Sequence, residues 1–306
     1  MLEASLLFQY SPWLLFAIAL MAVLYSSVGH GGASGYLAAM ALWGLAPHEM
    51  RPAALLMNIV VTCWLLYRFK PYKLMPHSLF WPLVIVSTPA AFFGGLIKID
   101  ASIYAIAVGV LLLLAAIRML VNPSAAEKVV PPARWLTVVV GGILGFASGI
   151  TGIGGGVFLS PILLIFGWCS VRQSTAVAAG FILLNSLGGL SGYWVSAQPW
   201  PDGTAWLVLA AFVGCLVGAE LASHKASSGT LKKLLAAVLF IASAKMIYAA
   251  LYSEILEQHV RTAHGLKRFY TVPRGGSVGL SAPWIKKSPT KIPLINLHRC
   301  RPDYAP

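Results

Sequence analysis

Charge is scarce in this chain. Only 10% of its 306 residues are charged, and Asp and Glu together account for nine of them. A soluble domain carries about 25% charged residues, so this chain has too little charge to cover a water-facing surface. Hydrophobic residues make up 58% of the sequence, and the mean hydropathy is +0.78. This composition predicts that the lipid bilayer is the solvent of the protein.

Several functional signatures are missing. The four cysteines stand singly, with no Cys-x-x-Cys pair, so we expect neither a disulfide framework nor a thiolate metal site. No Gly-x-x-x-x-Gly-Lys-Ser/Thr loop is present, so the chain itself is not expected to hydrolyse ATP, and no cofactor is implied. No Lys or Arg precedes Arg51, so the N-terminus lacks the basic region of a signal peptide, and the first apolar segment is expected to be a retained helix.

Ten apolar segments recur along the chain. Two of them are far shorter than the roughly 20 residues that a full membrane crossing needs. Each short segment directly follows a glycine-rich stretch, which predicts a half-helix or a re-entrant piece. The segments are Pro12–Val28, Ser34–Trp43, Pro52–Tyr67, Leu79–Ile97, Ile103–Leu120, Trp135–Ser148, Val157–Phe166, Ser174–Val195, Thr204–Leu221 and Leu231–Leu251.

Basic residues gather in three of the connecting segments, and the connections between these carry almost none. Loops rich in Lys and Arg lie on the cytoplasmic side of a membrane. The first five apolar segments therefore start outside and end inside, and the next five run the opposite way, so the N-terminus and the tail are predicted outside. The clusters are Arg68, Lys70 and Lys73; Arg118, Lys128 and Arg134; and Lys225, Lys232 and Lys233.

The predicted fold class is an all-α polytopic membrane protein built from two inverted five-segment repeats. Residues 1–120 form the first repeat, 121–134 a cytoplasmic linker, and 135–251 the second repeat. With broken or re-entrant half-helices, this gives about 8–10 membrane segments. Residues 252–306 hold nine of the 22 Lys and Arg and no apolar run long enough to span, so a disordered basic tail is expected.

The two glycine-rich stretches align with each other. Gly29-His30-Gly31-Gly32 in the first half matches Gly152-Ile153-Gly154-Gly155 in the second, 123 residues later. Broken apolar segments at matching places in two halves of a membrane protein point to a transport site.

A half-helix that begins inside the membrane points unpaired backbone N–H groups at the break, and its dipole adds partial positive charge there. Such an end binds an anion without a buried cation. The alternative is that the glycines only let helices pack closely. The candidate substrate-binding glycines are Gly31, Gly32, Gly154, Gly155 and Gly156.

Uncharged polar residues add candidate ligands. Ser34 and Thr151 flank the breaks and would donate either to the anion or to backbone groups freed by the breaks. Asn58 and Asn185 lie in the long segment after each half-helix and should face the protein interior. We expect Asn58 to brace the first break and Asn185 to bind substrate. Other hydroxyls flank the breaks at Ser26, Ser27, Ser148 and Ser160.

The ionisable candidates are few. His30 is the only histidine within a break, and it would either couple proton movement to transport or serve as a neutral hydrogen-bonding group. Arg51 and Arg172 each precede a long segment and would gather anions at the outer and inner entrances, unless they are interfacial anchors. Lys245 is expected to snorkel to the outer interface.

The second break carries a family resemblance. The sequence from Gly152 to Pro161 resembles the G-x-G-G-G-x-x-x-x-P signature of the sulfite exporter TauE/SafE family, and Ser174–Ala179 with Asn185 and Ser186 looks like the helix that follows it. The resemblance covers about residues 12–251. It implies transport of small sulfur-containing anions, such as sulfite or an organosulfonate, across the bacterial inner membrane. His30 departs from the aliphatic residue of the second copy, which leaves the substrate open.

The predicted function is therefore a secondary transporter for small anions that works by alternating access, not an enzyme. Its expected partners are the anion and the bilayer, with a homo-oligomer left open. Nucleic acid is not expected, because the positive charge sits in loops and the tail. One alternative is an anion channel that uses the same glycines. Another is a membrane serine protease, since Gly32-Ala33-Ser34-Gly35 resembles the rhomboid motif, although no later apolar segment carries a mid-helix histidine to serve as the base.

Overall fold

The computed structural model describes residues 10–27, 29–120, 129–130, 132–221 and 236–252. All of them belong to the first of the chain's two units, Met1–Glu257. These residues form helices and short connections, and no strand occurs among them. Most of the predicted linker 121–134 and nearly all of the predicted tail 252–306 lie outside the described residues.

The prediction of an all-helical polytopic membrane protein is confirmed. Within the described ranges, six helices are long and apolar enough to cross a membrane, and four further apolar helices are shorter. In chain order the helices are α2 (Pro12–Ser26), α3 (Ala33–Trp43), α4 (Pro47–Phe69), the 3₁₀ turn η1 (Pro71–Leu74), α5 (His77–Leu96), α6 (Ala101–Leu120), α7 (Arg134–Thr151), α8 (Gly156–Ile165), α9 (Val171–Val195), α10 (Thr204–Leu221) and the helix Ala236–Tyr252.

Two predicted boundaries were wrong. The third segment begins at Pro47 rather than Pro52, because Pro47 takes the first helical position and the Glu49 carboxylate accepts the Ala46 N–H at 2.9 Å. The first segment begins at Pro12 as predicted, but its helix has 15 residues and ends at Ser26, two residues before the predicted Val28. The polar turn after it satisfies the helix end, since the His30 N–H donates to the Tyr25 carbonyl at 3.0 Å.

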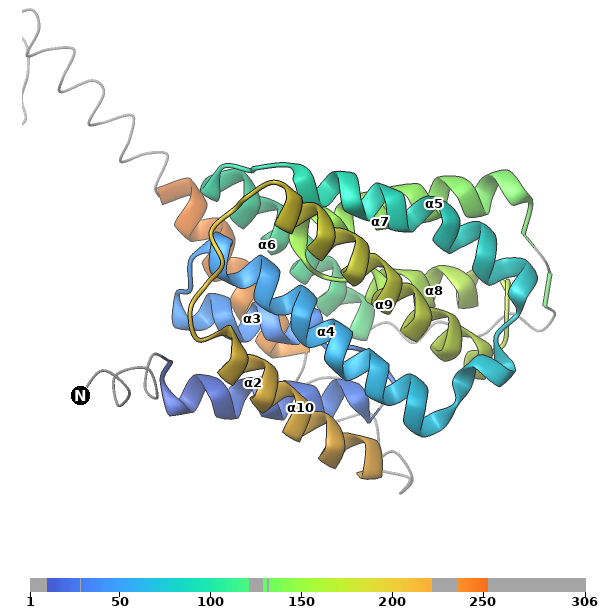
Figure 1. Cartoon of the computed structure of the whole chain (residues 1–306), viewed down its shortest axis with the longest axis horizontal. Coiled ribbons are helices and arrows are strands. Elements are labelled where there is room, and N and C mark those ends of the chain that lie inside the picture. Colours follow the sequence, from blue (N-terminus) through green and yellow to red (C-terminus); the bar gives the residue numbers. More distant parts are fainter. Residues whose placement is uncertain (1–9, 28, 121–128, 131, 222–235, 253–306) are drawn as a thin grey trace, which may run out of the picture. The chain divides into compact units, whose positions relative to one another are not determined.

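Helices from the two halves of the chain pack in matching pairs. α5 lies against α7, α10 lies against α2, and α4 lies against α9. Figure 1 shows α5 and α7 at the top and α2 and α10 at the bottom, with α4 and α9 between them. The central pair has neighbours on both sides, because α9 also contacts α5 and α7, and α4 also contacts α10.

Small residues allow the closest of these approaches. Gly141, Gly145 and Gly149 recur every four residues along one face of α7. Each of them lies against the backbone of α5, in turn at Leu83, Ser87 and Ala91. A side chain at any of the three would overlap that backbone, so glycine is required for the contact. On α10, Gly214 and Gly218 make the equivalent approach to α2.

The outer surface of the bundle is apolar. Large hydrophobic side chains are exposed on helices from both halves, which is the pattern of a surface that faces lipid. They include Trp13, Phe16, Trp81, Ile85, Phe93, Ile143, Trp194 and Leu209.

Candidate functional site

Both glycine-rich stretches break the helical path, as the sequence predicts. α2 gives way to α3 through Gly32, which precedes α3 with φ of 90°, and α7 gives way to α8 through Gly155, which precedes α8 with φ of 74°. These left-handed conformations are costly for residues with a Cβ and accessible to glycine. The breaks are therefore encoded by glycine at these two positions.

The N-termini of α3 and α8 are buried helix starts without side-chain caps. The residues that precede these helices, Gly32 and Gly155, are glycines and supply no side-chain cap. The first-turn N–H groups of any helix lack a carbonyl partner one turn earlier. In α3 and α8 these groups point back toward the two breaks and carry the positive end of the helix dipole.

The two breaks meet in the centre of the bundle. A Cβ added at Gly31 would lie 2.9 Å from Asn58 Oδ1 and 3.1 Å from Ile182 Cγ2. One added at Gly154 would lie 2.7 Å from Asn58 Nδ2 and 3.0 Å from the same Ile182 methyl group. Asn58 on α4 and Ile182 on α9 thus stand between the glycines of both halves. We call Gly31, Gly154, Asn58 and Ile182 the break site.

The two asparagines predicted for the site are both fully buried. The Asn58 Nδ2 donates to the Ser186 hydroxyl at 3.3 Å, while its Oδ1 has no hydrogen-bond partner in the part of the chain that the structure describes. Neither amide atom of Asn185 has one. Buried amides are nearly always paired in native proteins, so unsatisfied amides beside a helix break mark a place that can bind a polar ligand.

The break site is closed to the surroundings in this conformation. All four of its residues are buried, as are the neighbouring candidates Gly32, Gly155 and Gly156. An ion held here would be shielded from water, and interactions with backbone dipoles would be correspondingly stronger.

The hydroxyls of Ser34 and Thr151 bond within the protein. Ser34 Oγ lies 2.7 Å from the Tyr25 hydroxyl, and Thr151 Oγ1 donates to the Ala147 carbonyl at 2.7 Å. Each contact braces the helix on one side of a break. The protease alternative needs a base on Ser34, and the partner that the structure gives its hydroxyl is a tyrosine.

His30 connects the two breaks directly. Its Nε2 lies 2.9 Å from the hydroxyl of Ser160 on α8, so a residue of the first break contacts the second half-helix. The imidazole is half-buried. Because the hydrogen bond spans 130 residues of sequence, any relative movement of the two half-helices must break or reshape it.

The two candidate entrance arginines have different surroundings. Arg172 is exposed near the start of α9, which suits an entrance. Arg51 is only 3% exposed, and its guanidinium donates to the carbonyls of Gly149, Ile97 and Gly94 at 2.9, 3.0 and 2.6 Å. An entrance residue is expected to be exposed, and Arg51 is not. Its guanidinium instead connects the ends of α5 and α7 to α4.

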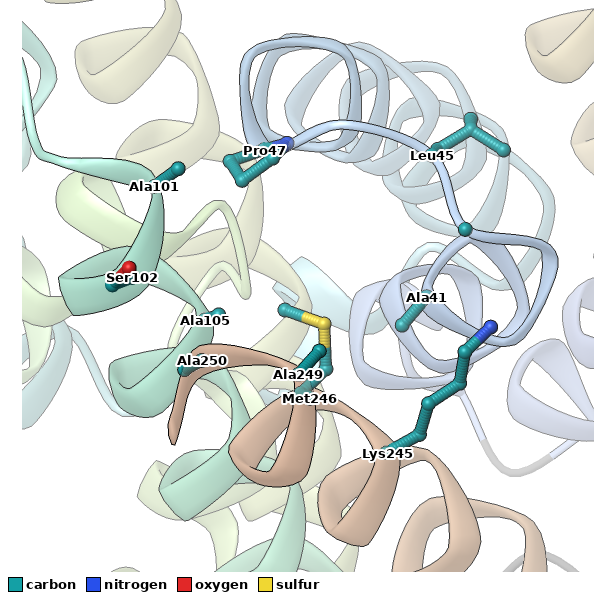
Figure 2. Close-up of a pocket in the computed structure, with 11 residues that line it drawn as sticks. Ala41, Leu45, Pro47, Ala101, Ser102, Ala105, Lys245, Met246, Ala249 and Ala250 are labelled. Atoms are coloured by element: carbon teal, nitrogen blue, oxygen red, sulfur yellow. The ribbon is translucent and has the colours of Figure 1, made fainter. Parts of the chain in front are cut away.

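Lys245 lies at a surface cavity away from the break site. Its Nζ donates to the Leu42 carbonyl at 2.6 Å, at the end of α3. The cavity has a volume of about 230 Å³ and lies between the ends of α3, α6 and the helix Ala236–Tyr252. Figure 2 shows the Lys245 side chain at its rim, reaching toward α3. The remaining lining, which includes Ala41, Ala105 and Met246, is largely apolar and offers an anion few partners.

The profile of the family described as sulfite exporter TauE/SafE matches residues 14–246, about three quarters of the chain. The chain belongs to this family. A probable membrane transporter protein, y4hK, from Sinorhizobium fredii is 32% identical over 237 residues, which cover 76% of this chain and 96% of that protein. A probable membrane transporter protein from Methanocaldococcus jannaschii, MJ0441, is 43% identical over 56 residues, 18% of this chain and 21% of that protein. No solved structure matches the chain.

Membership of the TauE/SafE family agrees with the helices. The family is one of membrane transporters, and the six long apolar helices make this member a multi-pass membrane protein. The matched residues include both breaks and every candidate site residue. The tail from residue 253 onward lies outside the match.

Sequence reasoning missed two residues that contact the breaks. Ile182 contacts both breaks, but an isoleucine within an apolar segment carries no signal of its role. Tyr104 on α6 donates to the Thr151 carbonyl at 3.0 Å and so holds the end of α7. A tyrosine in an otherwise apolar segment is a weak signal, because its hydroxyl needs a partner when buried.

Proposed function

We propose that this TauE/SafE protein is a secondary transporter that binds a small sulfur-containing anion, sulfite or an organosulfonate, at the break site. The observation that carries the proposal is the meeting of two uncapped half-helix starts at Asn58 and Ile182. Backbone N–H groups from α3 and α8 would donate to the anion's oxygens from opposite sides. In this closed conformation Asn58 and Ile182 fill the space beside Gly31 and Gly154, so both side chains would turn aside for the oxygens to approach the backbone.

The charge of the surroundings supports an anion. Arg51 is the one buried Asp, Glu, Lys or Arg among the described residues. A carboxylate close to the site would repel the ligand, and the described core contains none. Asn58 would complete the shell around the sulfur-bearing group, and Asn185 would bind another part of the substrate, because an amide can turn to present N–H to an oxygen.

Alternating access is the proposed mechanism. Counted within each half, α2 and α7 are the first helices, α4 and α9 the third, and α5 and α10 the fourth. The fourth helix of each half packs against the first helix of the other half, and the two third helices pack against each other. A two-fold relation between inverted halves would give this pattern, which supports rocking of the two repeats about the break site. We place the chain in the bacterial inner membrane in the predicted orientation. The loop of Lys70 and the entrance residue Arg172 then lie on the cytoplasmic side, and the loop of Asp202 lies on the outer side.

His30 is proposed as the coupling residue. Its ring can change charge near neutral pH, and its contact with Ser160 joins the first break to the second half-helix. Protonation would therefore act on the relative position of the two halves while adding positive charge beside the anion.

The variant Gly31→Ala tests the proposal. Its methyl group would enter the break site 2.9 Å from Asn58 Oδ1, and Gly31 does not have the positive φ of its neighbours Gly29 and Gly32. Overpacking a tight site costs about 1–3 kcal/mol, so sulfite uptake into proteoliposomes should fall about tenfold. The matched control is Gly142→Ala on α7, whose methyl group would make only an ordinary 3.6 Å contact with Val86.

Normal sulfite flux through Gly31→Ala would contradict the assignment of the break site. Equal loss in Gly142→Ala would show that the effect is general misfolding. The wild-type flux also separates the carrier from the anion channel: saturation at low rates supports the carrier, and single-channel currents would refute it.

A further inference from the structure

Three helices bury polar side chains that have no hydrogen-bond partner within the described residues. On α5, α7 and α9 the fully buried residues of this kind are Ser87, Ser148 and Asn185, whose two hydroxyls and both amide atoms lack a partner. The three residues are 0%, 1% and 0% exposed. A buried polar group is costly unless it is paired. Such groups on three neighbouring helices indicate that something polar binds among them.

Close backbone contacts bring these side chains to one level of the bundle. Gly145, one turn before Ser148, packs against the backbone of Ser87. The residue after Ser148 packs against Gly189, one turn after Asn185. Residues one turn apart share a helix face, so Ser148 and Asn185 lie on the faces that meet α5 and each other.

This polar cluster adjoins the break site. Asn185 directly precedes Ser186, whose hydroxyl accepts the hydrogen bond from Asn58 Nδ2. A Cβ at Gly154 would lie 3.5 Å from the same Ser186 hydroxyl. Asn185 is therefore next in sequence to a side chain that contacts both Asn58 and the second break.

The local charge indicates which ligand the cluster takes. Arg51 Nε donates to the carbonyl of the residue that follows Ser148. The one ion pair among the described residues is Arg68 with Glu220, so the described structure places no carboxylate against the buried Arg51 charge. A buried cation repels a metal ion such as Na⁺ and attracts an electron-rich oxygen.

We propose that Ser87, Ser148 and Asn185 form a second subsite, which binds the oxygen-bearing group at the far end of a short organosulfonate. This inference rests on the proposed function, because the sulfonate itself occupies the break site. A hydroxyl or carboxylate two carbons away would then accept from the two serine hydroxyls and the Asn185 amide. The transporter should accordingly prefer an organosulfonate with a second polar group over one that ends in a methyl group.

The test compares 2-hydroxyethanesulfonate with ethanesulfonate, which has the same carbon chain without the hydroxyl. Binding of each is measured by calorimetry on the full purified chain in detergent. The wild type should bind 2-hydroxyethanesulfonate about fivefold more tightly, the value of one net hydrogen bond. Ser87→Ala and Ser148→Ala should each remove that preference and leave the affinity for ethanesulfonate unchanged.

The Tm of the ligand-free protein distinguishes a binding role of the two serines from a structural role. Neither serine hydroxyl has a partner among the residues that the structure describes, so Ser87→Ala and Ser148→Ala should not lower the Tm. The matched control is Ser243→Ala in the helix Ala236–Tyr252. That buried hydroxyl donates to the Gly109 carbonyl at 2.7 Å, so its loss should lower the Tm and keep the preference.

Equal wild-type affinity for the two sulfonates would overturn the subsite, as would a preference that survives in both alanine variants. Ordered water would then be what satisfies the serines. In either case the break site stands, because both sulfonates still bind. If the wild type binds neither sulfonate nor sulfite, the proposed function fails, and the subsite fails with it.

Discussion

Arg51 is a buried cation whose described hydrogen bonds all go to backbone carbonyls. Three carbonyls at the ends of α5 and α7 receive its N–H groups, and the guanidinium also lies 5.6 Å from the centre of the Tyr193 ring on α9. A planar guanidinium has five N–H donors, so it can bond to three separate carbonyls at once, which no other side chain does as well. One residue therefore fastens four helices at the level where the second break begins.

Replacing Arg51 with glutamine should destabilise the protein strongly. Each buried carbonyl left without a donor costs on the order of 1–3 kcal/mol, so the Tm in detergent should fall by about 5 °C or more. Arg172→Gln is the matched control, because that side chain is exposed. Equal Tm values for the two variants would contradict the fastening role of Arg51.

At this scale the sequence identified the breaking glycines but not the burial of Arg51. Gly32 and Gly155 stand out because they interrupt apolar segments at matching places. Arg51 precedes the long apolar run, so it was predicted at a helix start near the interface. The helix in fact begins four residues earlier, at Pro47, which carries Arg51 into the bundle. Which carbonyls would receive it depends on tertiary packing that no local pattern encodes.

The half-helices α3 and α8 are the elements that the sequence predicted best. Their short apolar length and the glycines before them locate both to within one residue at their starts. Which helices pack together was not predictable in the same way. The four-residue glycine spacing on α7 marks a close-packing face, but nothing in it names α5 as the partner.

The contact between His30 and Ser160 ties the first break to the second half-helix. His30→Gln should keep a hydrogen bond to Ser160 and remove the titration. If His30 couples proton movement to transport, the dependence of sulfite flux on pH should flatten across about pH 6–8 in this variant. Flux measured in proteoliposomes over that range provides the check. A pH profile that matches the wild type would exclude coupling through His30.

Across the whole bundle, α4 and α9 hold the break site between two outer pairs, α5 with α7 and α2 with α10. The break site is buried while large apolar side chains face outward, so its polar groups are enclosed by apolar residues that face lipid. The helical class follows from composition alone. The meeting of the two breaks does not follow from composition, because it depends on how α4 and α9 place Asn58 and Ile182 between the two glycine-rich stretches.

The most direct measurement is anomalous X-ray diffraction from crystals of the full chain soaked in selenite, whose selenium stands in for the sulfur of sulfite. The account predicts an anomalous peak beside Asn58, between Gly31 and Gly154, within hydrogen-bonding reach of the first turns of α3 and α8. Selenium found only elsewhere, for example at the surface cavity beside Lys245, would contradict it.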